Sequence, residues 1–244
     1  GKVKQGDSST AKTFTITNPG TLSLASLVLT KNGTNAGDFS VSSLSGTSIA
    51  AGAGSVTFTA TFTPGGIGAR NAAIHIASNL LGAKNPFDIA LIGTGLTAAD
   101  SWRQSKFNTT SNTGNAADSA DPNGNGIVNL IEYALNGDPT GSTAGISILP
   151  KASANGTNHL QLAFTRYLDR NDITLTVQGV DSLTATWTDL AQSINGAAFT
   201  VLASGASVNE TGTGNTRAVT AGDLYLMTDP AHPQRFMRLK VTRP

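Results

Sequence analysis

The sequence predicts a mainly β protein, built from two antiparallel β-sandwiches joined by a short segment that contains two helices. Apolar and polar side chains alternate with a period of two over many short runs, as in strands with one buried face. Turn-forming sequences such as Asn32-Gly33 separate these runs. Helical periodicity and acidic residues gather in the middle of the chain. The expected domains are residues 1–95, 96–141 and 142–244.

The first expected domain shows the alternation most clearly. Thr13, Thr15 and Thr17 alternate with Phe14 and Ile16, which places threonine on a solvent face and the apolar residues on a core face. Further short runs follow at the spacing of a β-sandwich. They are expected at residues 22–30, 38–41, 56–63, 70–77 and 87–92.

The second expected domain differs in charge and in periodicity. Its net charge is −3, whereas the β-rich parts before and after it carry +3 and +1. Two short helices are expected, at residues 98–107 and 128–136. In the second, Leu130, Ile131 and Leu135 repeat at helical spacing, and Gly137 follows as the expected end of the helix.

The third expected domain returns to strands. Ile173, Leu175 and Val177 face one side of an expected strand, while Thr174 and Thr176 face the other, so a second antiparallel sandwich is expected. Its strands are expected at residues 146–149, 159–168, 172–180, 197–202, 217–220, 223–228 and 235–242.

Oxygen-bearing residues recur at fixed intervals between the two expected helices. In the stretch Asp-Pro-Asn-Gly-Asn-Gly-Ile-Val-Asn-Leu-Ile-Glu, positions 1, 3, 5, 9 and 12 carry side-chain oxygens. Position 6 is a glycine that permits a sharp turn, and position 7 offers its carbonyl, which completes the spacing of a calcium loop. About six or seven hard oxygen ligands suit Ca²⁺ better than Mg²⁺. The expected ligands are Asp121, Asn123, Asn125, Ile127, Asn129 and Glu132.

Chance explains this match poorly. With the residue frequencies of this chain, the pattern is expected about 2 times in 10,000 such chains, and Glu132 is one of only two glutamates. The alternative is an ordinary loop before a helix, with Glu132 in solvent. Asp118 and Asp138 are expected either to bind the ion as extra ligands, to support the ligands, or to be ordinary solvated or capping carboxylates. Because Asp121 and Glu132 are the only formal charges in the loop, weak affinity is expected, with Kd about 10⁻⁴ to 10⁻³ M.

Composition argues against most other functions. The net charge is +1 without a basic run, and no apolar stretch approaches the roughly 18 residues of a membrane span, so we expect neither nucleic-acid binding nor membrane insertion. The absence of cysteine excludes disulfides and thiolate zinc sites. Motifs of serine hydrolases, zinc proteases and nucleotide-binding loops are absent, so we expect no catalytic residues and no enzyme. Trp102 and Trp187 are expected in the protein core.

The first 95 residues resemble a known family. Five separated stretches carry the likeness, namely residues 14–20, 37–41, 58–64 with Gly68, 74–76 and 91–95. Together they are similar to the hydin/ASH type of immunoglobulin-like domain, which in bacteria is often labelled choice-of-anchor D. The resemblance implies a seven-stranded sandwich that acts as a spacer or interaction module of large surface proteins, without catalytic residues.

Two further resemblances concern the rest of the chain. The loop at residues 121–132 is similar to dockerin and thrombospondin-type calcium repeats, although asparagine replaces the usual aspartate at Asn123 and Asn125. A C-terminal unit of large secreted proteins from Verrucomicrobia-type bacteria is resembled by residues 102–103, 120–139, 166 onward with 177–178 and Trp187, and 235–239. That resemblance implies a position near the end of a longer protein and no known reaction.

These features predict a non-catalytic structural or adhesion module, stabilised by calcium, at the C-terminal end of a large bacterial protein. We expect it outside the cell or on the cell surface, with other domains of the same protein as partners, and cell-surface glycans or proteins as further candidates. The alternative is an accessory polysaccharide-binding module of a secreted hydrolase, which a row of exposed aromatic side chains on one sheet face would favour.

Overall fold

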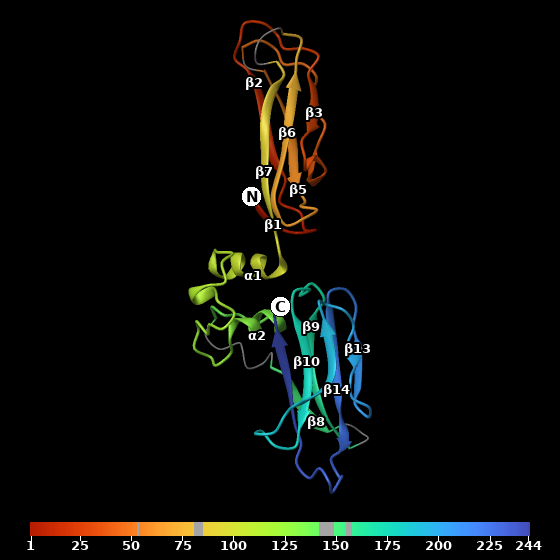
Figure 1. The fold of residues 1–244 in the computed structure, drawn as a ribbon. Coiled ribbons are helices and arrows are strands. Elements are labelled where there is room, and N and C mark those ends of the chain that lie inside the picture. The colour runs from red at the N-terminus through yellow and green to blue at the C-terminus, as the bar shows by residue number, and fades with distance from the viewer. Residues whose placement is uncertain (53, 81–84, 142–148, 155–157) are drawn as a thin grey trace. The chain divides into compact units, whose positions relative to one another are not determined.

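The computed structural model describes residues 1–52, 54–80, 85–141, 149–154 and 158–244, and it divides the chain into two compact units, Gly1–Thr97 and Ala98–Pro244 (Figure 1). Each unit contains two sheets made mainly of antiparallel strands, which confirms the predicted mainly β class. The division lies two residues after the expected end of the first domain. Most of the strand expected at residues 146–149 lies outside the described residues.

The first unit is a two-layer sandwich whose sheets have the strand orders β1-β7-β6-β3 and β2-β5-β4. Strand β1 pairs with β7 in parallel, and the other pairs are antiparallel. A short 3₁₀ helix, Ala36–Asp38, precedes β4. The strands are β1 Lys2–Lys4, β2 Lys12–Asn18, β3 Val28–Asn32, β4 Phe39–Val41, β5 Gly54–Phe62, β6 Gly68–Ala77 and β7 Phe87–Leu96.

The alternation seen in the sequence places the core of the first unit between its two sheets. Along β5, Val56, Phe58 and Phe62 are buried, and the threonines between them are only half-buried. The rings of Phe39 and Phe62 stack with their centroids 4.8 Å apart. Ile74 of the facing sheet is fully buried against them. The first unit therefore has a hydrophobic core of its own.

The second unit contains both helices and a second pair of sheets, ordered β12-β11-β10-β15 and β13-β14-β9-β8. Its helices are α1 Ala98–Phe107 and α2 Asn129–Leu135, with a 3₁₀ turn at Gly114–Ala116 between them. Its strands are β8 Lys151–Ala154, β9 His159–Tyr167, β10 Thr174–Val180, β11 Thr188–Ile194, β12 Thr200–Val201, β13 Ser207–Thr211, β14 Thr216–Leu226 and β15 Phe236–Thr242.

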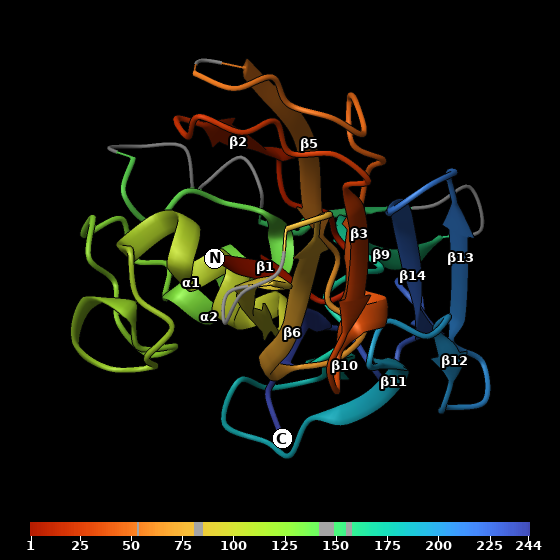
Figure 2. The same cartoon turned by 90° about the horizontal axis from the view of Figure 1, so that it is seen from above.

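The helical segment shares the core of the second sandwich, although a separate connector was expected at residues 96–141. Helices α1 and α2 lie side by side (Figure 2), and Trp102 of α1 meets Tyr133 of α2 edge to face, with ring centroids 5.6 Å apart. Both side chains belong to the same buried cluster as Leu175 and Val177 of β10. The helices are too short to bury their apolar faces against each other alone, so they pack on the sheet.

Two buried ion pairs tie the second sandwich together across its strands. Arg166 is almost fully buried and forms a bidentate ion pair with Glu210, in which Arg166 Nη2 lies 3.0 Å from Glu210 Oε2. Asp223 is buried and accepts two hydrogen bonds of 2.6 Å from Arg235. Glu210 is therefore bound to a cation inside the fold. No helix among the described residues has the length and apolar character needed to cross a membrane.

Candidate metal centre

The expected calcium loop follows the 3₁₀ turn and extends into the first turn of α2, within the second unit. Gly124 and Gly126 adopt positive φ angles of 68° and 83°, a backbone conformation that residues other than glycine and asparagine rarely adopt. Gly126 occupies position 6, where a calcium loop turns sharply. The backbone therefore adopts a conformation that favours glycine at position 6, where the calcium-loop motif has a glycine.

Local hydrogen bonds turn the first three oxygen-bearing side chains toward the inside of the loop. Asp121 accepts the N–H groups of Asn125 and Gly126 at 3.2 and 2.8 Å. Asn125 Oδ1 accepts the N–H of Ile127 at 2.8 Å. The Asn123 amide nitrogen donates to two carbonyls, those of Asp138 and Gly141. This fixes the Asn123 amide so that Oδ1 faces the N–H of Asn125, at 3.3 Å.

Glu132 carries the most informative geometry of the loop. Its side chain is 0% exposed, which excludes the alternative of a solvated glutamate. Its Oε1 accepts a hydrogen bond of 3.0 Å from Asn125 Nδ2. Its Oε2 is buried and has no hydrogen-bond partner among the described residues. An ionisable oxygen left without a partner inside a protein costs about 1–3 kcal/mol or more, so such a group points to a missing cation or donor.

Asn129 repeats this pattern one helical turn earlier. Its side chain is 0% exposed, and Nδ2 donates to the carbonyls of Asn115 and Ala117 at 2.8 and 2.7 Å. Because these two acceptors fix the orientation of the amide, Oδ1 must be the free end, and it too is buried without a partner in the described part of the chain. Positions 9 and 12 of the loop thus each hold a buried oxygen that lacks a donor.

The residues present therefore fit a calcium ion. Asp121, Asn123 and Asn125 offer oxygens on the loop, and the unpartnered oxygens of Asn129 and Glu132 lie on α2, while Ile127 offers its carbonyl. Among the described residues, no three His, Cys, Asp or Glu side chains gather in one place that could hold a metal. The expected ligand set contains only two carboxylates, so such a cluster is not part of it.

The two carboxylates that flank the loop are engaged by cations of the protein. Asp118 accepts hydrogen bonds of 2.8 Å from both Arg103 and Arg243. Burial acts to raise the pKa of Asp118, but the hydrogen bonds from the two arginines outweigh it and hold that pKa below its usual value. Asp138 is paired with Lys106 at 3.1 Å. Both carboxylates thus support the surroundings of the loop through ion pairs.

A buried network connects the loop to the sandwich. Tyr133 follows Glu132 directly, is fully buried, and donates a hydrogen bond of 2.5 Å to Asp172. Burial and this hydrogen bond raise the pKa of Tyr133 well above its usual value. Arg243 lies over the Tyr133 ring at 5.0 Å and pairs with Asp172 and Asp118. Helix α2 therefore presents Glu132 to the loop and Tyr133 to the core.

The aromatic side chains do not form a sugar-binding row in the described part of the second unit. Trp102 lies in the core, as expected. Trp187 is half-buried and packs beneath the guanidinium of Arg238 at 4.0 Å, so it stands outside the buried core cluster in which it was expected. Tyr225 stacks with His232. Phe236, 37% exposed, is the exposed aromatic residue there.

Comparisons with known proteins yield little for this chain. No family model matches it. No curated protein matches it either. Among solved structures, it is similar to the secreted serine protease VesC from Vibrio cholerae, with 12% sequence identity and a TM-score of 0.33. That likeness covers 100% of this chain and 48% of the protease chain, so the chain spans about half the length of the protein it matches. At this TM-score the likeness supports no conclusion about fold or activity.

Proposed function

We propose that the protein is a non-catalytic structural module of a larger bacterial surface or secreted protein, and that calcium bound at residues 121–132 stabilises its second unit. The observation that carries the proposal is a pair of buried oxygens, Glu132 Oε2 and Asn129 Oδ1, that have no hydrogen-bond partner in the described part of the chain. They stand at two of the positions at which the motif requires ligands. A bound Ca²⁺ would give both oxygens a positively charged partner.

The chain's own residues explain how such a site would act on stability. Asn129 and Glu132 lie on the side of α2 that belongs to the loop, while Tyr133 and Leu135 of the same helix are buried in the core of the second unit. Fixing the ligand side of a seven-residue helix also fixes its core side, because the helix is too short to be stable by itself. Occupancy therefore favours the folded second unit over its unfolded state.

The charge of the loop sets the range of affinity. Asp121 and Glu132 are its only acidic side chains, so the attraction for a divalent cation is weaker than in loops with three or four carboxylates. We place Kd at about 10⁻⁴ to 10⁻³ M, the range of extracellular calcium modules. That range suits a structural ion in an extracellular medium. The partners we propose are other domains of the same protein.

Calorimetric titration of the chelator-treated protein with CaCl₂ tests the proposal. We expect one binding site in the range given above, little response to MgCl₂, and a higher melting temperature of the second unit in calcium. Asp88→Asn serves as a control, since Asp88 is an exposed carboxylate of the first unit and should leave the titration unchanged. No heat and no shift in melting temperature up to about 10 mM Ca²⁺ would refute the proposed role of calcium.

A further inference from the structure

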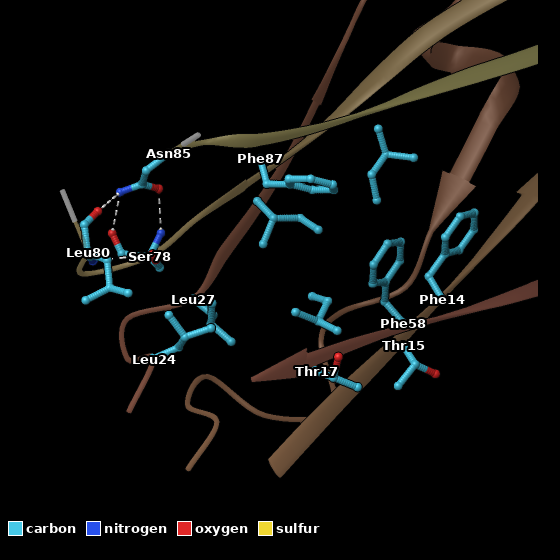
Figure 3. A pocket seen from close by; sticks show the side chains of 13 residues that line it. Phe14, Thr15, Thr17, Leu24, Leu27, Phe58, Ser78, Leu80, Asn85 and Phe87 are labelled. Atoms are coloured by element: carbon cyan, nitrogen blue, oxygen red, sulfur yellow. Dashed lines mark hydrogen bonds between the residues drawn. The ribbon is translucent and has the colours of Figure 1, made fainter. Parts of the chain in front are cut away.

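The apolar cavity of the first unit, shown in Figure 3, has a volume of about 500 Å³. Its walls are mainly apolar side chains such as those of Phe14, Phe58 and Phe87. Among the described residues that line it, none is acidic or basic. Groups that can react with one another gather instead in the second unit, at the turn that follows α2.

Three peptide bonds of the chain join an aspartate to a proline, at residues 121–122, 138–139 and 229–230. Proline has no backbone N–H, so its nitrogen cannot attack the aspartate side chain to form a succinimide. The carboxylate can instead attack its own main-chain carbonyl carbon, because this attack closes a five-membered cyclic anhydride. The proline nitrogen then leaves as a secondary amine, which breaks the chain.

The turn at residues 138–141 holds the Asp138 carboxylate close to the peptide bond that follows it. Asp138 Oδ1 accepts hydrogen bonds from the N–H and the hydroxyl of Thr140, at 3.2 and 2.8 Å, as in an Asx turn. Gly141 leaves room for the carboxylate, since a Cβ there would lie 3.1 Å from Asp138 Oδ2. Among the described residues no hydrogen bond reaches Oδ2, so this oxygen keeps its lone pairs for attack.

Two donors polarise the carbonyl group of Asp138. Its oxygen accepts Asn123 Nδ2 at 3.0 Å and the N–H of Gly141 at 3.1 Å. Donors at these distances stabilise the negative charge that develops on a carbonyl oxygen when its carbon is attacked, as in an oxyanion hole. Asn123 Nδ2 also donates to the carbonyl of Gly141 at 2.8 Å, which fixes its position before any reaction.

Lys106 places an amine beside this carboxylate. It lies in the last turn of α1, and its Nζ is 3.1 Å from Asp138 Oδ1. Asp229 makes the same kind of turn, because its Oδ1 accepts the N–H of Ala231 at 2.9 Å and its carbonyl accepts the N–H of His232 at 3.1 Å. In the described part of the chain, however, no lysine pairs with Asp229. The Asp229–Pro230 bond is therefore an internal control for the effect of the amine.

We propose that the chain cleaves itself between Asp138 and Pro139 and transfers the Asp138 side-chain acyl group to Lys106. Asp138 Oδ2 attacks the Asp138 carbonyl carbon, the C–N bond to Pro139 breaks, and the Lys106 ammonium gives one proton to the proline nitrogen. The Lys106 amine then attacks Cγ of the anhydride. An amide bond forms between Nζ and Cγ, the main-chain carbonyl carbon leaves as an α-carboxylate, and the second proton of Nζ goes to the proline amine. Atoms and charges balance without a further reactant.

This reaction takes place once in each chain, so it agrees with a module that turns over no external substrate. Its product is a covalent ring of residues 106–138 that encloses the whole calcium loop, in a chain that has no cysteine for a disulfide. The contacts that carry the proposal all join protein groups. The proposal therefore goes beyond the calcium site and does not depend on it.

The test is incubation of the purified full chain at neutral pH, in chelator and separately in calcium, followed by denaturing electrophoresis and peptide mass mapping. We expect one fragment that begins at Pro139 and another, residues 1–138, whose mass is one water lower than that of the hydrolysed fragment because Lys106 and Asp138 are linked. Cleavage at residues 138–139 should exceed cleavage at residues 229–230 by at least about tenfold. Cleavage with the link in either condition supports the proposal, whatever the calcium titration shows.

Three variants separate the steps. Lys106→Arg keeps a cation beside Asp138 but removes the amine, so the chain should cleave by hydrolysis of the anhydride and carry no link. Asp138→Ala removes the attacking carboxylate and should leave this bond intact, whereas the matched control Asp229→Ala should cleave and link like the parent. The proposal fails if the parent stays intact in both conditions, if it cleaves without a link, or if Asp138→Ala cleaves at the same bond.

Discussion

Replacing Glu132 by glutamine should change stability in opposite directions with and without calcium. In the structure, the carboxylate has one oxygen bonded to Asn125 and one buried oxygen without a hydrogen-bond partner among the described residues. Glutamine keeps the size of the side chain and removes the charge. In calcium, the same substitution removes the ligand at position 12, which supplies two charged oxygens to the ion. The variant should therefore be more stable than the parent in chelator and less stable in calcium.

The magnitudes follow from the geometry. Relieving a buried, unpaired charged oxygen should stabilise the chelated variant by about 1 kcal/mol, the low end of the usual cost, because the new amide also needs partners. With Kd near 10⁻⁴ M and about 10 mM calcium, the parent gains about 2.7 kcal/mol from binding. If the variant gains little, its stability relative to the parent changes from about +1 to about −2 kcal/mol between the two conditions.

Urea unfolding of both proteins, in chelator and in calcium, measures this reversal directly. The signal should come from the second unit, for example from the buried Trp102. Asn129→Ala is the comparison, since it should weaken calcium binding less than Glu132→Gln does, because position 9 often binds through water. An equal effect of Glu132→Gln in both conditions would show that Glu132 is structural and does not bind the ion.

Three further outcomes are expected. Arg243→Ala should destabilise the second unit by about 2–4 kcal/mol in thermal unfolding, because it leaves two carboxylates without their shared cation. Gly95→Ala should destabilise the first unit by about 1–3 kcal/mol, since its Cβ would collide with the Gly66 carbonyl. Asp38→Asn should reduce the acid sensitivity of the first unit in pH titrations followed by circular dichroism. Its hydrogen bond from Arg70 holds the pKa of Asp38 low, so the associated stability is present above about pH 4 and is lost as the pH falls through the folded pKa.

Matched variants control for general effects of substitution. Arg217→Ala removes an arginine whose guanidinium, within the described residues, bonds to the backbone carbonyls of Gly214 and Thr216, and it should cost less than about 0.5 kcal/mol. Gly37→Ala adds a Cβ where no atom lies within 4 Å, so it should not destabilise the first unit. If Arg243→Ala and Arg217→Ala have equal effects, the network around Tyr133 does not connect the loop to the sandwich in the way described.

Much of the strand pattern was predictable because alternation directly reports which face is buried. Residues 70–77 were expected as a strand and form most of β6, and the strand expected at residues 235–242 contains all of β15. The run expected at residues 22–30 was misplaced, since only Val28–Asn32 forms β3. Residues 217–220 and 223–228 were expected as two strands but join in β14, where a bulge interrupts the alternation. Strands β11 and β13 were missed, because Thr188–Ile194 and Ser207–Thr211 carry too few apolar residues to show a period.

Helix positions were predictable, whereas the residue at which α2 ends was not. The expected helix at residues 98–107 coincides with α1, and the one at 128–136 contains α2. Gly137 was expected to end α2, but Asn136 takes the left-handed conformation instead, with φ of 60°. Asparagine tolerates that conformation, and its Oδ1 accepts a hydrogen bond from Arg170 of the sandwich. Only a contact distant in sequence could select Asn136 over the glycine beside it.

The sequence by itself determined the ligand candidates of the loop, because a calcium loop is a local device whose spacing along the chain is its geometry. The tertiary structure alone decided that Glu132 and Asn129 are buried, each with an oxygen that has no partner among the described residues, because burial depends on how α2 packs against strands far along the chain. It likewise decided that Asp118 belongs to Arg103 and Arg243, since Arg243 lies 125 residues away. Pairings of that kind arise when the chain folds, and no periodicity or spacing in the sequence encodes them.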